Sequence, residues 1–96
     1  MRVVVLARVE ALPGHEAEVE QLLKWQVGPT LEERGCLNYD LHRDRENPRV
    51  FWLHETWACE ADLDRHSRSE HLTLNRERLR AHLATATEIH RLAKLG

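Results

Sequence analysis

Two histidines in the last third of the chain are the residues best suited to proton chemistry. His66 and His71 lie five positions apart and flank the break between two short segments that we expect to be helical. A neutral imidazole is the side chain that most readily takes up a proton near neutral pH. We therefore expect one of the two to act as a general base at the mouth of a pocket. The alternative is a helix cap or a surface histidine.

A metal site is the rival use of these histidines, because seven histidines is a high count for 96 residues. Two ligands on one helical face need a spacing of three or four, whereas His66 and His71 are five apart. The sequence contains no HExxH or CxxC motif, and Cys36 and Cys59 lie far apart. We expect no metal, and we expect both cysteines to be reduced, small buried side chains.

Aromatic and acidic side chains at strand spacing form the second candidate group. Trp57 follows Glu55 by two positions, so in a strand both side chains face the same way. An indole offers a ligand a flat apolar wall and one N–H donor. Tyr39 shares a face with Leu37 and Leu41, and its hydroxyl could position a ligand oxygen. The alternative for both aromatic residues is a plain role in the core.

The periodicity of the apolar residues predicts the elements that must position these side chains. Alternating runs predict strands at residues 2–11, 36–45 and 50–58, and helical spacing predicts helices at 15–33, 60–68 and 70–84. We expect Gly28-Pro29 to kink or interrupt the first helix. Residues 86–95 fit a last strand, with a continuation of the preceding helix as the alternative. We therefore expect one α+β domain, residues 1–96, with the ferredoxin-like order β-α-β-β-α-β.

The first predicted strand is apolar on both of its faces, which bears on assembly. One face carries Val3, Val5, Ala7 and Val9, and the other carries Val4 and Leu6. A domain of this length has only enough helix to cover one face of a sheet. We therefore expect a second copy of the chain to cover the other face, so that the protein is a homodimer.

The composition of the chain excludes several classes of partner and compartment. The formal net charge is −2 with acids and bases interleaved, which argues against nucleic acid as a partner. No apolar stretch approaches the roughly 18 residues that span a bilayer, so we expect no membrane insertion. The apolar run at the start of the sequence is too short, and charged residues follow it too closely, for a signal peptide. We therefore expect a cytoplasmic protein. The four glycines form neither GxGxxG nor a P-loop, so we expect no nucleotide cofactor and no other cofactor.

Short motifs along nearly the whole chain resemble the antibiotic biosynthesis monooxygenase family. The first half carries Pro13-Gly14-His15-Glu16, Pro29-Thr30 and Gly35-Cys36-Leu37-Asn38-Tyr39, and the second half carries Phe51, Glu55-Thr56-Trp57, Leu63, His66, Ser69 and His71. The resemblance implies a dimeric α+β barrel with a pocket in each subunit, between the sheet and the helices. It implies a small hydrophobic or aromatic ligand there. It places Trp57 in the ligand pocket. We expect His66, His71 and Trp57 to take part in the chemistry, and we expect substrate contacts from Tyr39, Glu55, Leu53, Phe51 and Leu63.

Members of that family carry out several reactions, so the resemblance leaves the reaction open. Some are cofactor-free oxygenases of quinols or polyketide phenols, others degrade haem, and one branch isomerises a sugar-derived signal. The polyketide oxygenases are similar in having an asparagine where this chain has Leu53, and the haem degraders have one on the first strand, which is absent here. We expect a cofactor-independent monooxygenase for a small quinol or phenol. An isomerase or tautomerase, or a non-catalytic ligand-binding module of the stress response, are the alternatives.

Overall fold

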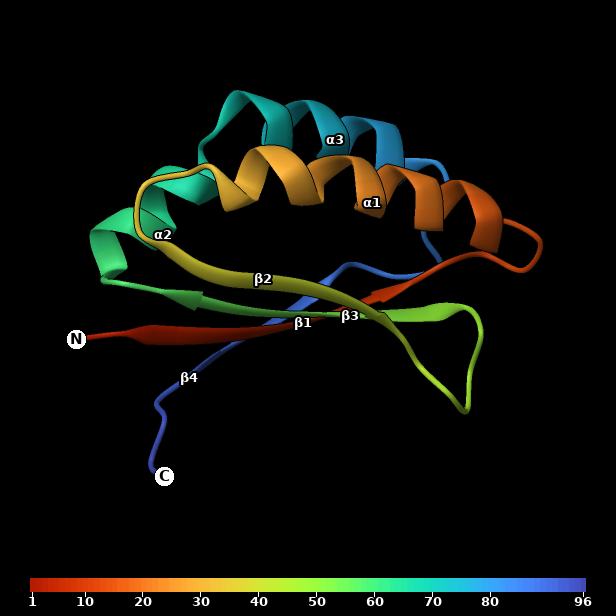
Figure 1. Ribbon diagram of the computed structural model, residues 1–96. Helices are drawn as coiled ribbons and strands as arrows, with labels where there is room; N and C mark the ends of the chain where they lie inside the picture. The colour runs from red at the N-terminus through yellow and green to blue at the C-terminus, as the bar shows by residue number, and fades with distance from the viewer.

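The fold places all of its helices on one face of a four-stranded sheet. The computed structural model describes residues 1–96, with the elements β1 (Val3–Glu10), α1 (Glu16–Leu31), β2 (Cys36–Arg43), β3 (Val50–Trp57), α2 (Glu60–Ser67), α3 (Glu70–Arg80) and β4 (Glu88–Leu92). The helices lie above the sheet, and its other face is bare (Figure 1). The predicted ferredoxin-like order is confirmed, and the last segment is a strand rather than an extension of α3. None of the helices combines the length and the apolarity that crossing a bilayer requires.

The sheet is antiparallel throughout, with the strand order β2-β3-β1-β4. Along β1 every second residue is buried, and β3 buries four alternate residues, Phe51, Leu53, Glu55 and Trp57. Val5 pairs with Glu55 and Ala7 pairs with Leu53. Residues directly opposite each other on neighbouring strands point to the same face. The core therefore lies between this face of the sheet and the helices, and Glu55 is a carboxyl group inside it.

A bulge near the start of β2 changes the direction of one side chain from the predicted one. The pairing with β3 shifts between Cys36 and Asn38, so that Leu37 is the extra residue. Leu37 exposes 48% of its surface, whereas Tyr39 is buried as predicted. The prediction that Leu37 shares the inward face of Tyr39 and Leu41 is therefore wrong. A bulge inserts one residue into a strand, and residues on its two sides no longer alternate in step.

The first helix also departs from expectation, because it runs through Pro29 and ends at Leu31. Gly28-Pro29 therefore does not interrupt the helix, and the alternative, a kink, stays a prediction. Pro29 lies in the last turn of the helix, where the missing N–H removes a single bond near the end of the ladder. The chain then turns at Gly35, whose φ of +81° suits a glycine.

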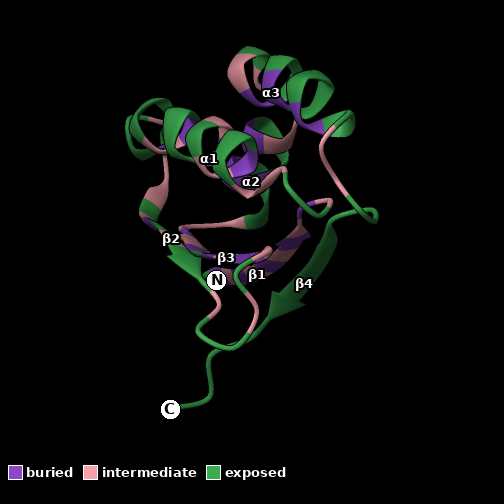
Figure 2. Ribbon diagram, turned by 90° about the vertical axis from the view of Figure 1, so that its right-hand side faces the viewer, coloured by how far each residue is buried: buried purple, intermediate pink, exposed green.

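The sheet face opposite the helices carries apolar side chains that nothing in the chain covers. Val4 and Leu6 of β1 are half-buried, and Leu92 of β4 exposes nearly half of its surface. All five residues of β4 are exposed, and Figure 2 shows this strand as an uncovered edge of the sheet. Exposed apolar patches of this kind often mark an interaction surface. The homodimer expected from the sequence stays a prediction that this face supports.

Candidate active site

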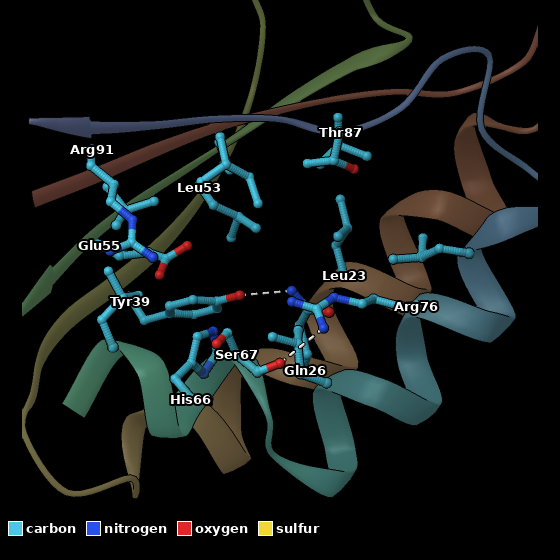
Figure 3. Close-up of a pocket in the computed structure, with 17 residues that line it drawn as sticks. Leu23, Gln26, Tyr39, Leu53, Glu55, His66, Ser67, Arg76, Thr87 and Arg91 are labelled. Carbon is cyan, nitrogen blue, oxygen red and sulfur yellow. Dashed lines mark hydrogen bonds between the residues drawn. The ribbon is translucent and has the colours of Figure 1, made fainter. Parts of the chain in front are cut away.

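A cavity of about 150 Å³ lies between the sheet and the helices. Most of its wall is apolar. The polar side chains that line it are Gln26, Tyr39, Glu55, His66, Ser67, Arg76, Thr87 and Arg91. Figure 3 shows these side chains converging on one space from the strands and from all three helices. The cavity thus combines an apolar wall with a few polar groups, which is the usual composition of a small-molecule site.

His66 lines this cavity, and one of its two ring nitrogens is held by another side chain. It lies in the last turn of α2 and is only 4% exposed. Its Nδ1 is 2.6 Å from Oε2 of Glu33. A carboxylate can only accept, so Nδ1 carries the proton and Nε2 keeps a free lone pair. No hydrogen bond within the protein occupies Nε2. Burial lowers the pKa of His66, with the Glu33 carboxylate opposing that effect, which favours the neutral imidazole.

His71 meets the same carboxylate but stands outside the cavity. Its Nε2 lies 3.2 Å from Oε2 of Glu33 and 3.0 Å from the hydroxyl of Thr30. The rings of His66 and His71 are 6.2 Å apart between centroids. His71 does not line the cavity wall. The structure therefore places His71 beside Glu33 and outside the wall of the cavity.

These three side chains could also hold a metal ion, because their ligand atoms all lie within 4.8 Å of one another. The spacing of five residues between His66 and His71 does not prevent both from binding one ion, since they come from two different helices. Two imidazoles and a carboxylate suit zinc and similar ions. A metal-bound histidine ordinarily donates its other ring N–H to a second group. In both histidines the ring nitrogen that does not face Glu33 has no hydrogen-bond partner. Hydrogen bonds to the shared Glu33 carboxylate are enough to explain why the three side chains lie together.

Glu55 is the second titratable group on the cavity wall. It is 5% exposed, and burial raises its pKa to about 7, against the lowering effect of a hydrogen bond from Trp57. That bond joins Nε1 of Trp57 to Oε1 of Glu55 at 2.9 Å. Near neutral pH this carboxyl group is therefore divided between its two protonation states. It can give or accept a proton inside the cavity.

Tyr39 is tied to α1 and α3 by a chain of hydrogen bonds. Its hydroxyl accepts from Nε2 of Gln26 at 2.7 Å, and Oε1 of Gln26 accepts from Nδ2 of Asn75 at 2.6 Å. The same nitrogen of Asn75 donates to the backbone carbonyl of Leu22 at 2.8 Å. Burial raises the pKa of the Tyr39 hydroxyl well above its ordinary value, with the nearby Glu55 as a further cause. Tyr39 therefore stays protonated.

The remaining residues assigned from the sequence divide between the cavity wall and its surroundings. Leu53 and Leu63 line the cavity, as do Tyr39, Glu55 and His66. Trp57 does not: it has no exposed surface, and its indole stacks on the His66 ring at 4.6 Å between centroids. Phe51 is buried away from the cavity, under the guanidinium of Arg43. Trp57 therefore supports His66, and Phe51 serves the core.

Sequence reasoning missed three residues that organise the site. Glu33, Gln26 and Asn75 each bond to a partner on another element. Glu33 lies in the connection between α1 and β2, two residues before Gly35, and nothing in its position in the sequence relates it to His66. Gln26 carried a usable signal, because a polar residue three positions after Leu23 interrupts the apolar stripe of its helix.

Comparisons with known proteins agree on one family. The family model described as antibiotic biosynthesis monooxygenase matches residues 2–78. The crystal structure of PA3566 from Pseudomonas aeruginosa is 35% identical, covers 99% of this chain and 95% of its own, and has a TM-score of 0.93. Rv0793 from Mycobacterium tuberculosis is 28% identical over 100% and 97% of the two chains, with a TM-score of 0.94. A structure described as an antibiotic biosynthesis monooxygenase is 29% identical over 98% and 99%, with a TM-score of 0.91. No curated protein matches the sequence.

Proposed function

The chain belongs to the antibiotic biosynthesis monooxygenase family, and we propose that it oxidises a small, single-ring quinol or phenol with molecular oxygen and without a cofactor. One observation carries the proposal. His66 is buried and lines a largely apolar cavity, its Nδ1 is fixed by Glu33, and its Nε2 has no hydrogen-bond partner within the protein. That is the arrangement a general base for a buried hydroxyl requires.

The size of the cavity supports a single-ring substrate. An engineered apolar cavity of about 150 Å³ holds one benzene molecule, and the cavity here has about the same volume. Val5, Leu23 and Leu53 supply apolar contacts for the faces of a ring. Exclusion of water by such a wall also limits side reactions of an oxidised intermediate.

In this reaction the protein orients the substrate and removes the proton of its hydroxyl group. His66 takes the proton of the substrate hydroxyl at Nε2, and the phenolate that remains gives electrons to oxygen far more readily than the phenol does. One oxygen atom then enters the ring and the other leaves as water. For a quinol the product is a hydroxyquinone, and all four electrons that reduce the oxygen molecule come from the substrate. Glu33 keeps His66 in the tautomer that can accept the proton.

Oxygen uptake tests the proposal. Metal-free protein, treated with a chelator, is mixed with a panel of single-ring hydroquinones and phenols in an oxygen electrode. We expect uptake above the spontaneous rate, and we expect His66→Gln to lower it by roughly 10²–10⁴-fold, the usual contribution of a general base. His82→Gln is the matched control, because His82 bonds to His15 and does not line the cavity. Absence of uptake across the panel, or uptake that His66→Gln leaves intact, contradicts the proposal.

A tautomerase or isomerase is the second candidate, and one observation favours it. His66 and Glu55 line the same cavity; the lowered pKa of His66 favours its neutral, proton-accepting form, and Glu55, with a pKa of about 7, is partly protonated near neutral pH. Two such groups can take a proton from one atom of a substrate and return it to another. Deuterium incorporation from heavy water into an enolisable ligand, measured by NMR under nitrogen, identifies this activity. Ligand binding with neither oxygen uptake nor deuterium exchange would identify a binding module.

We also propose that the working form is a homodimer, formed through the sheet face that carries Val4, Leu6 and Leu92. This assembly leaves the cavity on the helix side of each sheet. A cytoplasmic location remains an expectation from the sequence.

A further inference from the structure

The chain of hydrogen bonds behind Tyr39 has a direction, and that direction fixes what Tyr39 offers to a ligand. The Leu22 carbonyl can only accept, so the Asn75 atom 2.8 Å away from it must be the amide nitrogen. The same nitrogen lies 2.6 Å from Gln26, and the Gln26 atom there must be the acceptor oxygen. The other end of the Gln26 amide is then its nitrogen, which donates to the Tyr39 hydroxyl.

The hydroxyl proton of Tyr39 therefore has to point elsewhere. Its oxygen already accepts from Gln26, and no acceptor for its proton is present within the protein. Tyr39 lines the cavity, with its ring reaching across toward Gln26 (Figure 3). The cavity thus contains a hydrogen-bond donor whose orientation is set by a backbone carbonyl several side chains away.

We propose that this donor binds the oxygen of an ionised phenol, so that Tyr39 stabilises the phenolate formed in the reaction while Gln26 and Asn75 act as positioning residues. The inference rests on the proposed phenolic substrate and names the group that receives its negative charge. Preorganised donors aimed at a developing oxyanion are among the strongest contributions to catalysis.

Two neighbouring groups favour an anionic oxygen at this place. The rings of Tyr39 and His66 meet edge to face at 5.7 Å between centroids, so one substrate oxygen can reach both of them. Arg76 also lines the cavity, and its guanidinium bonds to the Ser67 carbonyl without a carboxylate partner. Its positive charge lowers the energy of an anion in the cavity.

The direction of the chain is maintained at a cost in free energy. Asn75 has no exposed surface, and its Oδ1 has no hydrogen-bond partner. A buried acceptor without a partner is unfavourable. If the Asn75 amide were rotated by 180°, its oxygen would face the Leu22 carbonyl and the Gln26 oxygen. Both of these groups are acceptors, so the Asn75 oxygen would still have no donor. The arrangement therefore holds the donor at Tyr39.

The test uses 4-nitrophenol, whose ionised form is coloured, as an optical probe under nitrogen. Titration of the probe in the presence of saturating protein gives the pKa of the bound probe. We expect the wild-type protein to lower this pKa by about one unit or more, the size expected for one hydrogen bond to a charged acceptor. We expect Tyr39→Phe to remove most of that shift. Binding of 4-nitroanisole, which cannot ionise, shows that the variant still forms the cavity.

Gln26→Glu tests the direction of the chain with the Tyr39 hydroxyl still present. A carboxylate at position 26 accepts from both neighbours, so the Tyr39 proton turns away from the cavity. We expect this variant to lose the shift as Tyr39→Phe does. The added charge also disfavours a phenolate, so the same change is made in the Tyr39→Phe background, where no hydroxyl can turn. The effect of Gln26→Glu should be clearly larger with Tyr39 present than without it.

Each outcome decides the inference. A shift that survives Tyr39→Phe, equal effects of Gln26→Glu in the two backgrounds, or failure of 4-nitrophenol to bind overturns it. The titration needs no oxygen and no turnover. Absence of oxygen uptake with an intact shift would overturn the proposed function alone, and uptake without a shift would overturn only the role of Tyr39.

Discussion

Glu55 is a buried carboxyl group whose ionisation acts against the fold. Its pKa rises from an ordinary value of 4.5 to about 7 in the folded state. Between these pH values the folded protein binds more protons than the unfolded chain at this group. The stabilising contribution is complete below about pH 4.5 and is lost as the pH rises through about 7. In neutral and alkaline solution the ionisation of Glu55 therefore lowers the free energy of unfolding. Buried titratable groups with shifted pKa values of this kind are common in active sites.

Replacement of Glu55 by glutamine tests this directly. The glutamine oxygen can still accept from Trp57, but it cannot ionise. We expect Glu55→Gln to gain stability relative to the wild-type protein by roughly 2 kcal/mol on going from pH 5 to pH 8. Urea unfolding at the two pH values measures the difference. The lowered pKa of His66 acts in the opposite direction, but it is common to both proteins and cancels.

Glu18→Gln, at an exposed position of α1, is the control and should show no such gain. Equal pH dependence in the wild-type protein and Glu55→Gln would mean that the carboxyl group is not held in an apolar environment.

Much of the cavity wall could be predicted at the residue scale, but its hydrogen bonds could not. Strand alternation gave the face of Glu55 and Tyr39 correctly. It could not separate Glu55, which lines the cavity, from Trp57, which lies beyond it, because alternation indicates a face and not a depth. The partners of His66 and Tyr39 were missed because Glu33, in the connection after α1, and Gln26, in α1, come from other parts of the fold. Such partners depend on how elements pack, which no local spacing encodes.

Gly35 lies in the connection between α1 and β2, close against the Asp62 side chain of α2. Its φ is +81°, and a Cβ at this position would overlap the side chain of Asp62. Asp62 is buried, and it bonds to Cys59 and Arg65. The position of α2, and with it the position of His66, therefore depends on the absence of a side chain at residue 35.

Two alanine substitutions separate the effect of backbone conformation from the effect of the overlap. Gly14 has a similar φ of +87°, but a Cβ there meets nothing within 4 Å. We expect Gly14→Ala to lower the free energy of unfolding by about 1 kcal/mol, and Gly35→Ala to lower it by about 3 kcal/mol or more. Chemical unfolding measures both values. Similar losses for the two variants would show that α2 moves away from residue 35 without strain.

Element types follow closely from the sequence, and the departures from them have local causes. The strands show alternation, and the preference for a last strand over a longer α3 is correct. The bulge at Leu37 gives no signal, because the letters on both sides of it still alternate. Pro29 is typical of a break in a helix. The sequence alone does not show that α1 continues past Pro29 and ends two residues later, at Leu31.

At the scale of the whole molecule, the sheet has one covered face and one bare face. The apolar residues on both sides of β1 predict a second copy of the chain, and the exposed apolar side chains on the bare face support that prediction. Leu6 lies near its centre, paired with His54 on one side and His90 on the other.

The assembly prediction is that the wild-type protein has twice the mass of one chain in solution at micromolar concentration, and that Leu6→Glu has the mass of one chain. Burial of a glutamate without a partner in an apolar interface is strongly unfavourable. Light scattering after size-exclusion chromatography measures both masses. Leu95→Glu, beyond the last strand, is the control and should stay dimeric. A stable wild-type monomer would contradict the prediction.

In the proposed complex a phenolic ring occupies the cavity with its oxygen between His66 and Tyr39. A crystal structure of the protein with an unreactive single-ring phenol, prepared without oxygen, reveals where the ring binds. We expect density for the ring against Leu53 and Leu23, with the phenolic oxygen within hydrogen-bond distance of both Nε2 of His66 and the Tyr39 hydroxyl. A ring bound on the bare face of the sheet, or an oxygen directed away from both side chains, would rule out this complex.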